Sequence, residues 1–171
     1  MTEVLTDAPA TERAVVLGLG EWRVTADPAS VLVCLGLGSC VAICLHDPLR
    51  NIGGMAHTVL PDSTAGRASN SGAKFVDLAL PLLLEEMAAA GASRVHLTAD
   101  IVGGASMLSG SSLTDVGNVG VRNVEAARSV LQRANLALRF DETGGAHGRT
   151  VRLSISTGEL IISSGNRTGG A

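Results

Sequence analysis

The sequence is poor in aromatic residues and has no run of basic residues. It contains one Trp, two Phe and no Tyr among 171 residues, and its formal net charge is −3. A nucleic-acid-binding surface needs clustered Lys and Arg residues, and a single-strand binder also needs aromatic side chains on which bases stack. We therefore expect no nucleic-acid partner.

Long apolar runs and an export signal are also missing. No stretch reaches the roughly 18 apolar residues from which a membrane-spanning helix is recognised. The first residues, MTEVLTDAPATERA, are acidic and polar, and lack the basic and apolar segments of a signal peptide. Three cysteines are an odd number for a disulfide framework. We expect a cytoplasmic monomer with reduced thiols and no membrane insertion.

Glycine and branched aliphatic residues are abundant instead. The chain has 21 Gly residues, and 46% of its residues are hydrophobic. Its length suits one domain with a core of Val, Leu, Ile and Ala. We predict this domain over residues 14–163. The polar segments on either side predict a disordered arm over residues 1–13 and a flexible tail over residues 164–171.

Strand-like and helix-like segments alternate within the domain. The apolar spacing predicts helices over residues 73–92 and 119–134, the first of them capped by Asn70 or Ser71, interrupted by Pro81 and ended by Gly91. Runs of branched apolar residues predict strands over residues 15–19, 22–25, 31–35, 41–46, 55–60, 95–102, 136–140, 151–156 and 159–163. Few helices among many strands indicate a mixed sheet structure rather than repeated βαβ units.

Cys40 and His57 are the residues with the clearest chemical potential. Cys40 directly follows Gly36-Leu37-Gly38-Ser39, and His57 lies in the apolar run GGMAHTVLP. A cysteine nucleophile needs a histidine base, and the main-chain N–H groups of Gly38 and Ser39 can bind the oxyanion of a tetrahedral intermediate. Such a set performs acyl transfer or amide hydrolysis. The residues alone leave the alternative open, since a free Cys and a lone His more often belong to a core.

The other Cys and His residues fit structural roles. Cys44 is expected in the core. His46 is expected at a surface strand end, His96 on the outward side of a strand, and His147 in a solvated glycine-rich loop. None of these four residues is predicted to take part in chemistry.

Zinc is the rival use for such residues. Cys34, Cys40, Cys44 and His46 all have even numbers, which suggests a shared strand face. On one extended strand, however, Cys40 and Cys44 lie about 13 Å apart. Tetrahedral zinc holds its ligands at roughly 2.0–2.3 Å. We therefore expect no metal, and we predict no other cofactor.

Longer motifs resemble a known family, the CheD chemoreceptor glutamine deamidases of bacterial chemotaxis. The resemblance is carried by LGLGSCVAICLHDP, GLGEWRV and IGGMAHTVLPDS, and it continues through FVDLALPLLLEEMAAAGASR, VGGASML, VGVRNVEAARSVL and TGGAHGRTVRLSISTGEL. It spans residues 14–163. It implies an α+β fold with three layers, α/β/β, in which two helices back a β-sandwich, as in the catalytic domain of cytotoxic necrotizing factor toxins.

The resemblance also implies an activity and site roles. Family members hydrolyse side-chain amides of chemoreceptor glutamines, producing glutamate and ammonia. Cys40 matches the nucleophile and His57 the general base. Cys34 occupies the orienting position, where the family usually has Thr. The implied partners are the cytoplasmic helices of chemoreceptors and, in some bacteria, the phosphatase CheC. Because a thiol is a weaker hydrogen-bonding group than a hydroxyl, a binding module with weak or no catalysis is the alternative.

Overall fold

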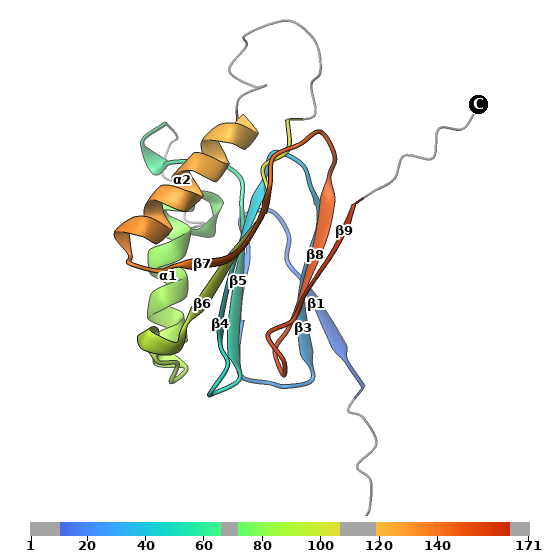
Figure 1. Cartoon of the computed structure of the whole chain (residues 1–171), viewed down its shortest axis with the longest axis vertical. Coiled ribbons are helices and arrows are strands. Elements are labelled where there is room, and N and C mark those ends of the chain that lie inside the picture. Colours follow the sequence, from blue (N-terminus) through green and yellow to red (C-terminus); the bar gives the residue numbers. More distant parts are fainter. Residues whose placement is uncertain (1–10, 66–71, 107–118, 165–171) are drawn as a thin grey trace, which may run out of the picture.

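The chain folds into three layers, two β-sheets and one layer of helices (Figure 1). The structure is a computed structural model, and it describes residues 11–65, 72–106 and 119–164. Within these residues it contains nine strands, two α-helices and three short 3₁₀ helices. The α+β class and the predicted helix-backed sandwich are confirmed.

The outer sheet has four strands in the order β1-β3-β8-β9. Its parallel pair joins β1 and β3, and its other pairs are antiparallel. The strands span Arg13–Val16 (β1), Ser30–Leu37 (β3), Arg149–Ser154 (β8) and Leu160–Ser164 (β9). Buried and half-buried residues alternate along β8, as expected for a strand with one face on a core.

The central sheet has five strands in the order β2-β5-β4-β6-β7. All its pairs are antiparallel except β6–β7. The strands span Trp22–Thr25 (β2), Ile52–Thr58 (β5), Val41–Asp47 (β4), Thr98–Gly103 (β6) and Leu138–Thr143 (β7). Every residue of β4 and β5 is buried, because helices cover one face of this sheet and the outer sheet covers the other.

Helices α1 (Val76–Ala89) and α2 (Val119–Arg133) cover the face of the central sheet that points away from the outer sheet (Figure 1). Pro81 lies inside α1 on its exposed side, and the helix runs through it and ends before Gly91, whose φ is 98°. The core beneath the helices is aliphatic and includes Val41, Ile43, Leu45, Ala56, Val76, Ala79, Leu80, Leu83, Met87, Ile101, Val124, Ala127, Val130 and Leu131.

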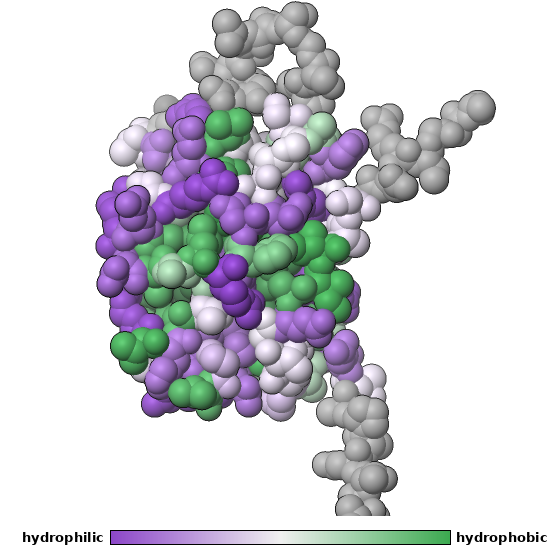
Figure 2. Space-filling model, viewed as in Figure 1, coloured by the Kyte–Doolittle hydropathy of each residue, from purple (hydrophilic) through white to green (hydrophobic). Residues whose placement is uncertain are grey.

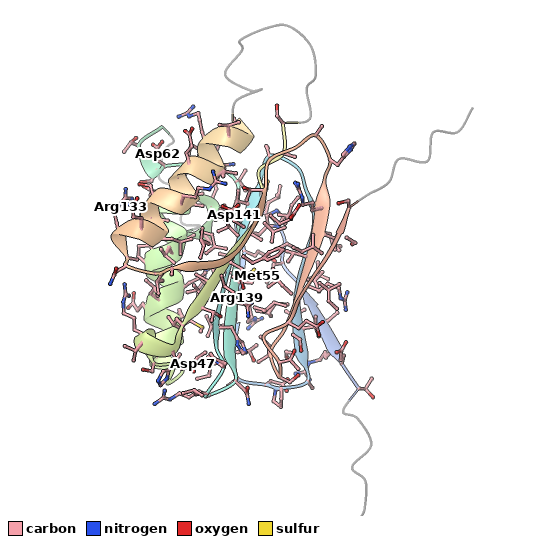
Figure 3. The ribbon with its side chains drawn as sticks, viewed as in Figure 1. Asp47, Met55, Asp62, Arg133, Arg139 and Asp141 are labelled. Atoms are coloured by element: carbon pink, nitrogen blue, oxygen red, sulfur yellow. The ribbon has the colours of Figure 1, made fainter. Side chains whose placement is uncertain are left out.

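A second core fills the space between the two sheets. It contains Leu32, Cys34, Leu37, Ala42, Cys44, Met55, Val102, Val151, Leu153 and Ile155, with Cys40 at its edge. The expectation for Cys44 is therefore confirmed. Figure 3 shows Met55 between the sheets.

His46 corrects the sequence prediction. It is 1% exposed rather than a surface strand end, and its Nε2 donates to the main-chain oxygen of Ile155 at 2.9 Å. The reason is topological: β4 is the central strand, and the β8–β9 turn packs over its end. His147 is exposed, as predicted.

Several element boundaries also differ from the prediction. β1 ends at Val16 because the following residues form a turn. β6 begins at Thr98, since Arg94–His96 form a 3₁₀ helix, so His96 lies before the strand and contacts Arg50. Helix α1 begins after Phe75, which supplies no side-chain cap.

The predicted caps of α1, residues 70 and 71, lie outside the described residues, as do 1–10 of the predicted arm and 165–171 of the predicted tail. Arg13, the last residue of the predicted arm, already belongs to β1, and Ser164, the first of the predicted tail, ends β9. Neither described α-helix has the length and apolar character to cross a membrane.

The ion pair between Arg139 and Asp100 links the two sheets on the side where β7 lies near the β8–β9 turn. Arg139 on β7 donates to both carboxylate oxygens of Asp100 on β6 and to the main-chain oxygen of Gly158 in the β8–β9 turn. Figure 2 shows apolar side chains across the middle of this face, interrupted by a hydrophilic one where Figure 3 labels Arg139. Because Asp100 is 1% exposed, its charge depends on Arg139 for compensation.

We expect Arg139→Met to lower the free energy of unfolding by about 2–3 kcal/mol, because it leaves the buried carboxylate of Asp100 without its partner. The loss stays moderate because Arg139 itself is partly solvated and the pair is therefore partly screened. The double variant Arg139→Met/Asp100→Leu should recover most of this loss, since removing both charges removes the unpaired one. Urea unfolding of both proteins measures the difference. Equal stabilities for the two variants would contradict this account.

Candidate active site

The β4–β5 ladder brings Cys40 and His57 to the same face of the central sheet. Ala42 pairs with His57, and Cys40 lies two residues before Ala42, directly before β4 begins. Residues two apart on a strand share a face, and diagonal neighbours across an antiparallel pair lie about 7–8 Å apart, within reach of long side chains. Both side chains therefore belong to the end of the layer between the sheets.

The imidazole of His57 has a defined tautomer. His57 is 4% exposed, and its Nδ1 lies 3.1 Å from the main-chain oxygen of Leu17. Because a carbonyl oxygen only accepts, Nδ1 carries the hydrogen, and in the neutral ring Nε2 then keeps its lone pair. Nε2 is buried and has no hydrogen-bond partner among the described residues. The ring thus presents an unoccupied proton acceptor.

The turn that follows β1, residues 17–21, also holds the backbone of His57. The N–H of Gly20 donates to the His57 oxygen at 2.8 Å, and the His57 N–H donates to the Glu21 oxygen at 2.9 Å. Within the turn, the Glu21 carboxylate accepts from the N–H of Gly18 at 2.7 Å. Main-chain and side-chain atoms of His57 are therefore fixed by the same turn.

The segment before β4, residues 38–40, is held by its carbonyl groups. All three carbonyl oxygens accept hydrogen bonds from segments distant in the sequence. The donors are, in order along the segment, the N–H of Ala105 at 2.7 Å, Nδ2 of Asn123 at 2.8 Å and the N–H of Gly104 at 2.7 Å. The main chain that carries Cys40 thus has little freedom to move.

The N–H groups of this segment are oriented by the same bonds. A trans peptide directs its N–H opposite to its C=O, and no cis peptide is present among the described residues. The N–H groups of Ser39 and Cys40 donate to no other described residue, and the Cys40 N–H lies close enough to its own sulfur to lower the thiol pKa. The oxyanion role predicted for Gly38 and Ser39 remains a prediction.

The thiol of Cys40 is half-buried. Burial raises its pKa above the ordinary value of about 8.5, and the smaller effect of its own N–H does not reverse this. The resting protein therefore holds Cys40 as a thiol at neutral pH. A reaction at this sulfur needs a base that removes the proton as the new bond forms.

Cys34 lies on β3, in the core between the sheets. Its thiol donates to the Met55 sulfur at 3.4 Å, and burial together with the nearby Cys40 raises its pKa to about 12. The His57 ring donates its hydrogen bond to the main-chain oxygen of Leu17, not to Cys34. The orienting role of Cys34 remains a prediction.

Metal binding finds no support in this geometry. Among the described residues, no group of three or more His, Cys, Asp or Glu side chains is arranged to hold a metal ion.

Two groups of the candidate site were not predicted from the sequence, the carbonyl of Leu17 and the side chain of Asn123. The carbonyl of Leu17 has no sequence signal, because any residue supplies a carbonyl. Asn123 had one: an amide on the apolar side of a helix, among Val124, Ala127 and Val130, indicates a buried polar partner.

Comparison with known proteins finds relatives that match most of the chain. The family model described as "CheD chemotactic sensory transduction" matches residues 59–164. The probable chemoreceptor glutamine deamidase CheD of Symbiobacterium thermophilum is 42% identical over 156 residues, which cover 91% of this chain and 94% of that protein. The chemoreceptor glutamine deamidase CheD of Thermotoga maritima is 43% identical over 147 residues, covering 86% and 89%. Among solved structures, the hypothetical protein YfiH of Bacillus licheniformis aligns with a TM-score of 0.46 and 16% identity over 80% of this chain and 61% of that one.

We expect iodoacetamide to alkylate Cys40 before Cys34 and Cys44, because burial raises the pKa of the other two thiols further. The Cys40 rate should keep rising at pH values above the ordinary thiol range, since its own pKa is raised. Peptide mapping of time points across a pH series measures all three rates. Equal rates for the three thiols in the folded protein would contradict the prediction.

Proposed function

Because the chain belongs to the CheD family, we propose that it is a protein-glutamine deamidase that converts glutamine side chains of chemoreceptors to glutamate. The observation that carries the proposal is the buried, unoccupied Nε2 of His57 on the same sheet face as the Cys40 thiol. A thiol on the same sheet face as an imidazole acceptor suits an amide-cleaving pair that transfers its proton during attack.

In the first half-reaction, Cys40 Sγ attacks the carbonyl carbon of the glutamine side chain as His57 Nε2 takes the thiol proton. The tetrahedral intermediate places its negative charge on the former amide oxygen, next to the N–H groups of Ser39 and Cys40, which donate to no other described residue. His57 then returns the proton to the amide nitrogen. The C–N bond breaks, ammonia leaves, and the glutamyl group remains on Cys40 as a thioester.

In the second half-reaction, His57 removes a proton from water as the water oxygen attacks the thioester carbonyl. The C–S bond breaks, the proton returns to the sulfur of Cys40, and glutamate is released. The balance is one glutamine side chain and one water for one glutamate side chain and one ammonia. No cofactor enters either step.

The orienting group in this mechanism is the main-chain oxygen of Leu17. It keeps the proton on Nδ1, so that Nε2 faces the reaction as a base. The imidazolium that forms is stabilised by the same carbonyl dipole. On this account the Cys34 side chain contributes packing against Met55 rather than orientation.

We infer that the substrates of this activity are the cytoplasmic helices of chemoreceptors and that the protein acts in the cytoplasm. CheC is a second partner, one that competes with receptors for the same protein. The Cys34 substitution favours one other function, a module that binds receptors and CheC without catalysis. Ammonia release separates the two functions.

The decisive experiment incubates the protein with purified cytoplasmic domain of a chemoreceptor from the same genome. Ammonia is measured enzymatically, and mass spectrometry of tryptic peptides locates glutamines converted to glutamate. Conversion of specific glutamines supports the deamidase. Stable binding to receptor or CheC without conversion of any glutamine would establish the binding module instead.

Cys40→Ala should abolish deamidation, because Ala offers no attacking atom. Since Cys40 is only half-buried, the loss of unfolding free energy should stay below about 1 kcal/mol. Cys44→Ala is the matched control: Cys44 is 0% exposed, so this variant should lose more stability and keep its activity. Deamidation by Cys40→Ala would exclude Cys40 as the nucleophile. Loss of activity in Cys44→Ala, at a temperature where that variant is folded, would show that the assay does not separate the attacking sulfur from core packing.

Cys34→Ala should leave kcat within about threefold of the wild type, because the Leu17 carbonyl that orients His57 survives any side-chain change. Cys34→Thr should keep or raise the activity, since a hydroxyl is the stronger hydrogen-bonding group. Steady-state ammonia release from the three proteins gives the comparison. If Cys34→Ala is as inactive as Cys40→Ala, the sulfur of Cys34 has a direct role and the assignment to Leu17 is wrong.

A further inference from the structure

Asn123 is a buried polar side chain that the proposed mechanism does not yet use. It lies in the second turn of α2 and is 0% exposed. Asn is a poor helix former and is seldom fully buried. Its position on the buried side of α2 therefore indicates a specific hydrogen-bond partner for the carboxamide.

The carboxamide of Asn123 binds two main-chain carbonyls. Nδ2 donates to the oxygen of Ser39 at 2.8 Å and to the oxygen of Val59 at 2.9 Å. Since carbonyl oxygens only accept, the NH₂ end of the amide must face both of them, which fixes the orientation of the group.

The other end of the amide has no partner. Oδ1 of Asn123 is buried without a hydrogen bond among the described residues. A buried unsatisfied acceptor costs about 1–3 kcal/mol. The fold tolerates this cost at a position that connects two segments of the active site, which favours a functional role over a purely stabilising one.

The two carbonyls belong to the two catalytic segments. Ser39 directly precedes Cys40, and Val59 follows His57 by two residues. Because the Ser39–Cys40 peptide is trans, holding its C=O on Asn123 directs the Cys40 N–H away from α2. That N–H donates to no other described residue and lies next to Sγ, where the oxyanion of a thiol addition forms.

Close packing of α2 supports this contact. Gly120, one turn before Asn123, lies so near residues 104–105 that a Cβ there would be 2.6 Å from the Ala105 oxygen. The N–H groups of residues 104 and 105 bind the carbonyls of Cys40 and Gly38. The first turns of α2 thus rest directly on the segment that carries the nucleophile.

We propose that Asn123 is a positioning residue whose carboxamide fixes the Ser39–Cys40 peptide, so that the Cys40 N–H serves as an oxyanion donor aligned with the strand of His57. This proposal rests on the proposed acyl-transfer chemistry at Cys40, but it does not depend on which protein is the substrate. On this proposal, the side chain of Asn123 on α2 determines the direction of the main-chain N–H of Cys40.

Two reagents separate this role from a general structural one. p-Nitrophenyl acetate acylates a thiol through a tetrahedral oxyanion, whereas iodoacetamide alkylates it by direct displacement without an oxyanion. Both reactions need the same sulfur. The ratio of the two rates at Cys40 therefore reports the oxyanion donor, and Cys40→Ala provides the background for each reagent.

Asn123→Leu should lower the acylation rate and the kcat for receptor deamidation about 10–100-fold, somewhat less than the deletion of a complete oxyanion donor. KM and the alkylation rate should stay within about threefold of the wild type. Asn123→Asp keeps the shape of the side chain. The ionised carboxylate of this variant cannot donate a hydrogen bond to the Ser39 oxygen, whereas the protonated carboxyl group can. The acylation rate of Asn123→Asp relative to the wild type should therefore rise as pH falls. The same ratio for Asn123→Leu should not rise.

Val130→Ala is the matched control, because Val130 is buried in the same helix but packs into the core beneath it. It should lose stability and keep both rates. The proposal is overturned if both Asn123 variants acylate at the wild-type rate, if acylation and alkylation fall in parallel, or if Val130→Ala shows the same selective loss. Thermal unfolding of each variant identifies the temperature at which all are folded, and Asn123→Asp serves if Asn123→Leu does not fold.

The outcomes for the two proposals are distinct. If the wild type deamidates no receptor but its acylation at Cys40 still depends on Asn123, the deamidase function fails and the positioning role stands. If the wild type deamidates receptor and the Asn123 variants match its kcat, the positioning role fails and the deamidase function stands.

Discussion

The antiparallel pairing of β4 with β5 at the centre of the fold is the constraint on which the site depends. Seven residue pairs, from Val41–Thr58 to Asp47–Ile52, fix the register. A shift of one residue would send the side chain of His57 to the helix-covered face, because successive strand residues alternate between faces. Buried cores on both faces of this ladder exclude such a shift. The shared face of Cys40 and His57 is thus a consequence of sheet register, not of loop conformation.

Burial decides the charge state in which this pair rests. A thiolate–imidazolium pair would place two charges at the edge of an apolar layer, and the raised pKa of Cys40 indicates that the thiol form is favoured there. The thiol form suits a reaction in which a base takes the proton during attack. It also protects the sulfur from oxidants and alkylating agents, which react with thiolates. In the proposed mechanism, reactivity then depends on a substrate that brings its carbonyl to the N–H groups next to Cys40.

The sequence predicted the layers well, because they depend on patterns that side chains carry. Branched apolar runs marked the strands. Cys40 and His57, suggested by the flanking glycines and the family motifs, lie on one sheet face, and their catalytic roles remain predictions. The burial of His46 was not predictable, since it follows from the central place of β4 and the packing of the β8–β9 turn. Residues 17–19 were predicted as the end of a strand because Leu17 and Leu19 continue the apolar residues of β1, but they belong to the turn. The Leu17 carbonyl escaped because main-chain groups have no sequence signature.

In the proposed mechanism, the groups that orient the reaction are mostly main-chain atoms: a carbonyl oxygen on His57 and N–H groups next to Cys40. On that proposal the Cys34 side chain does not orient His57, because the ring is held by the Leu17 carbonyl. Main-chain groups are insensitive to their own side chains but sensitive to whatever holds the chain in place. The side chains under the strongest constraint are therefore Glu21, which braces the turn that bears Leu17, and Asn123, which braces the peptide that bears Cys40.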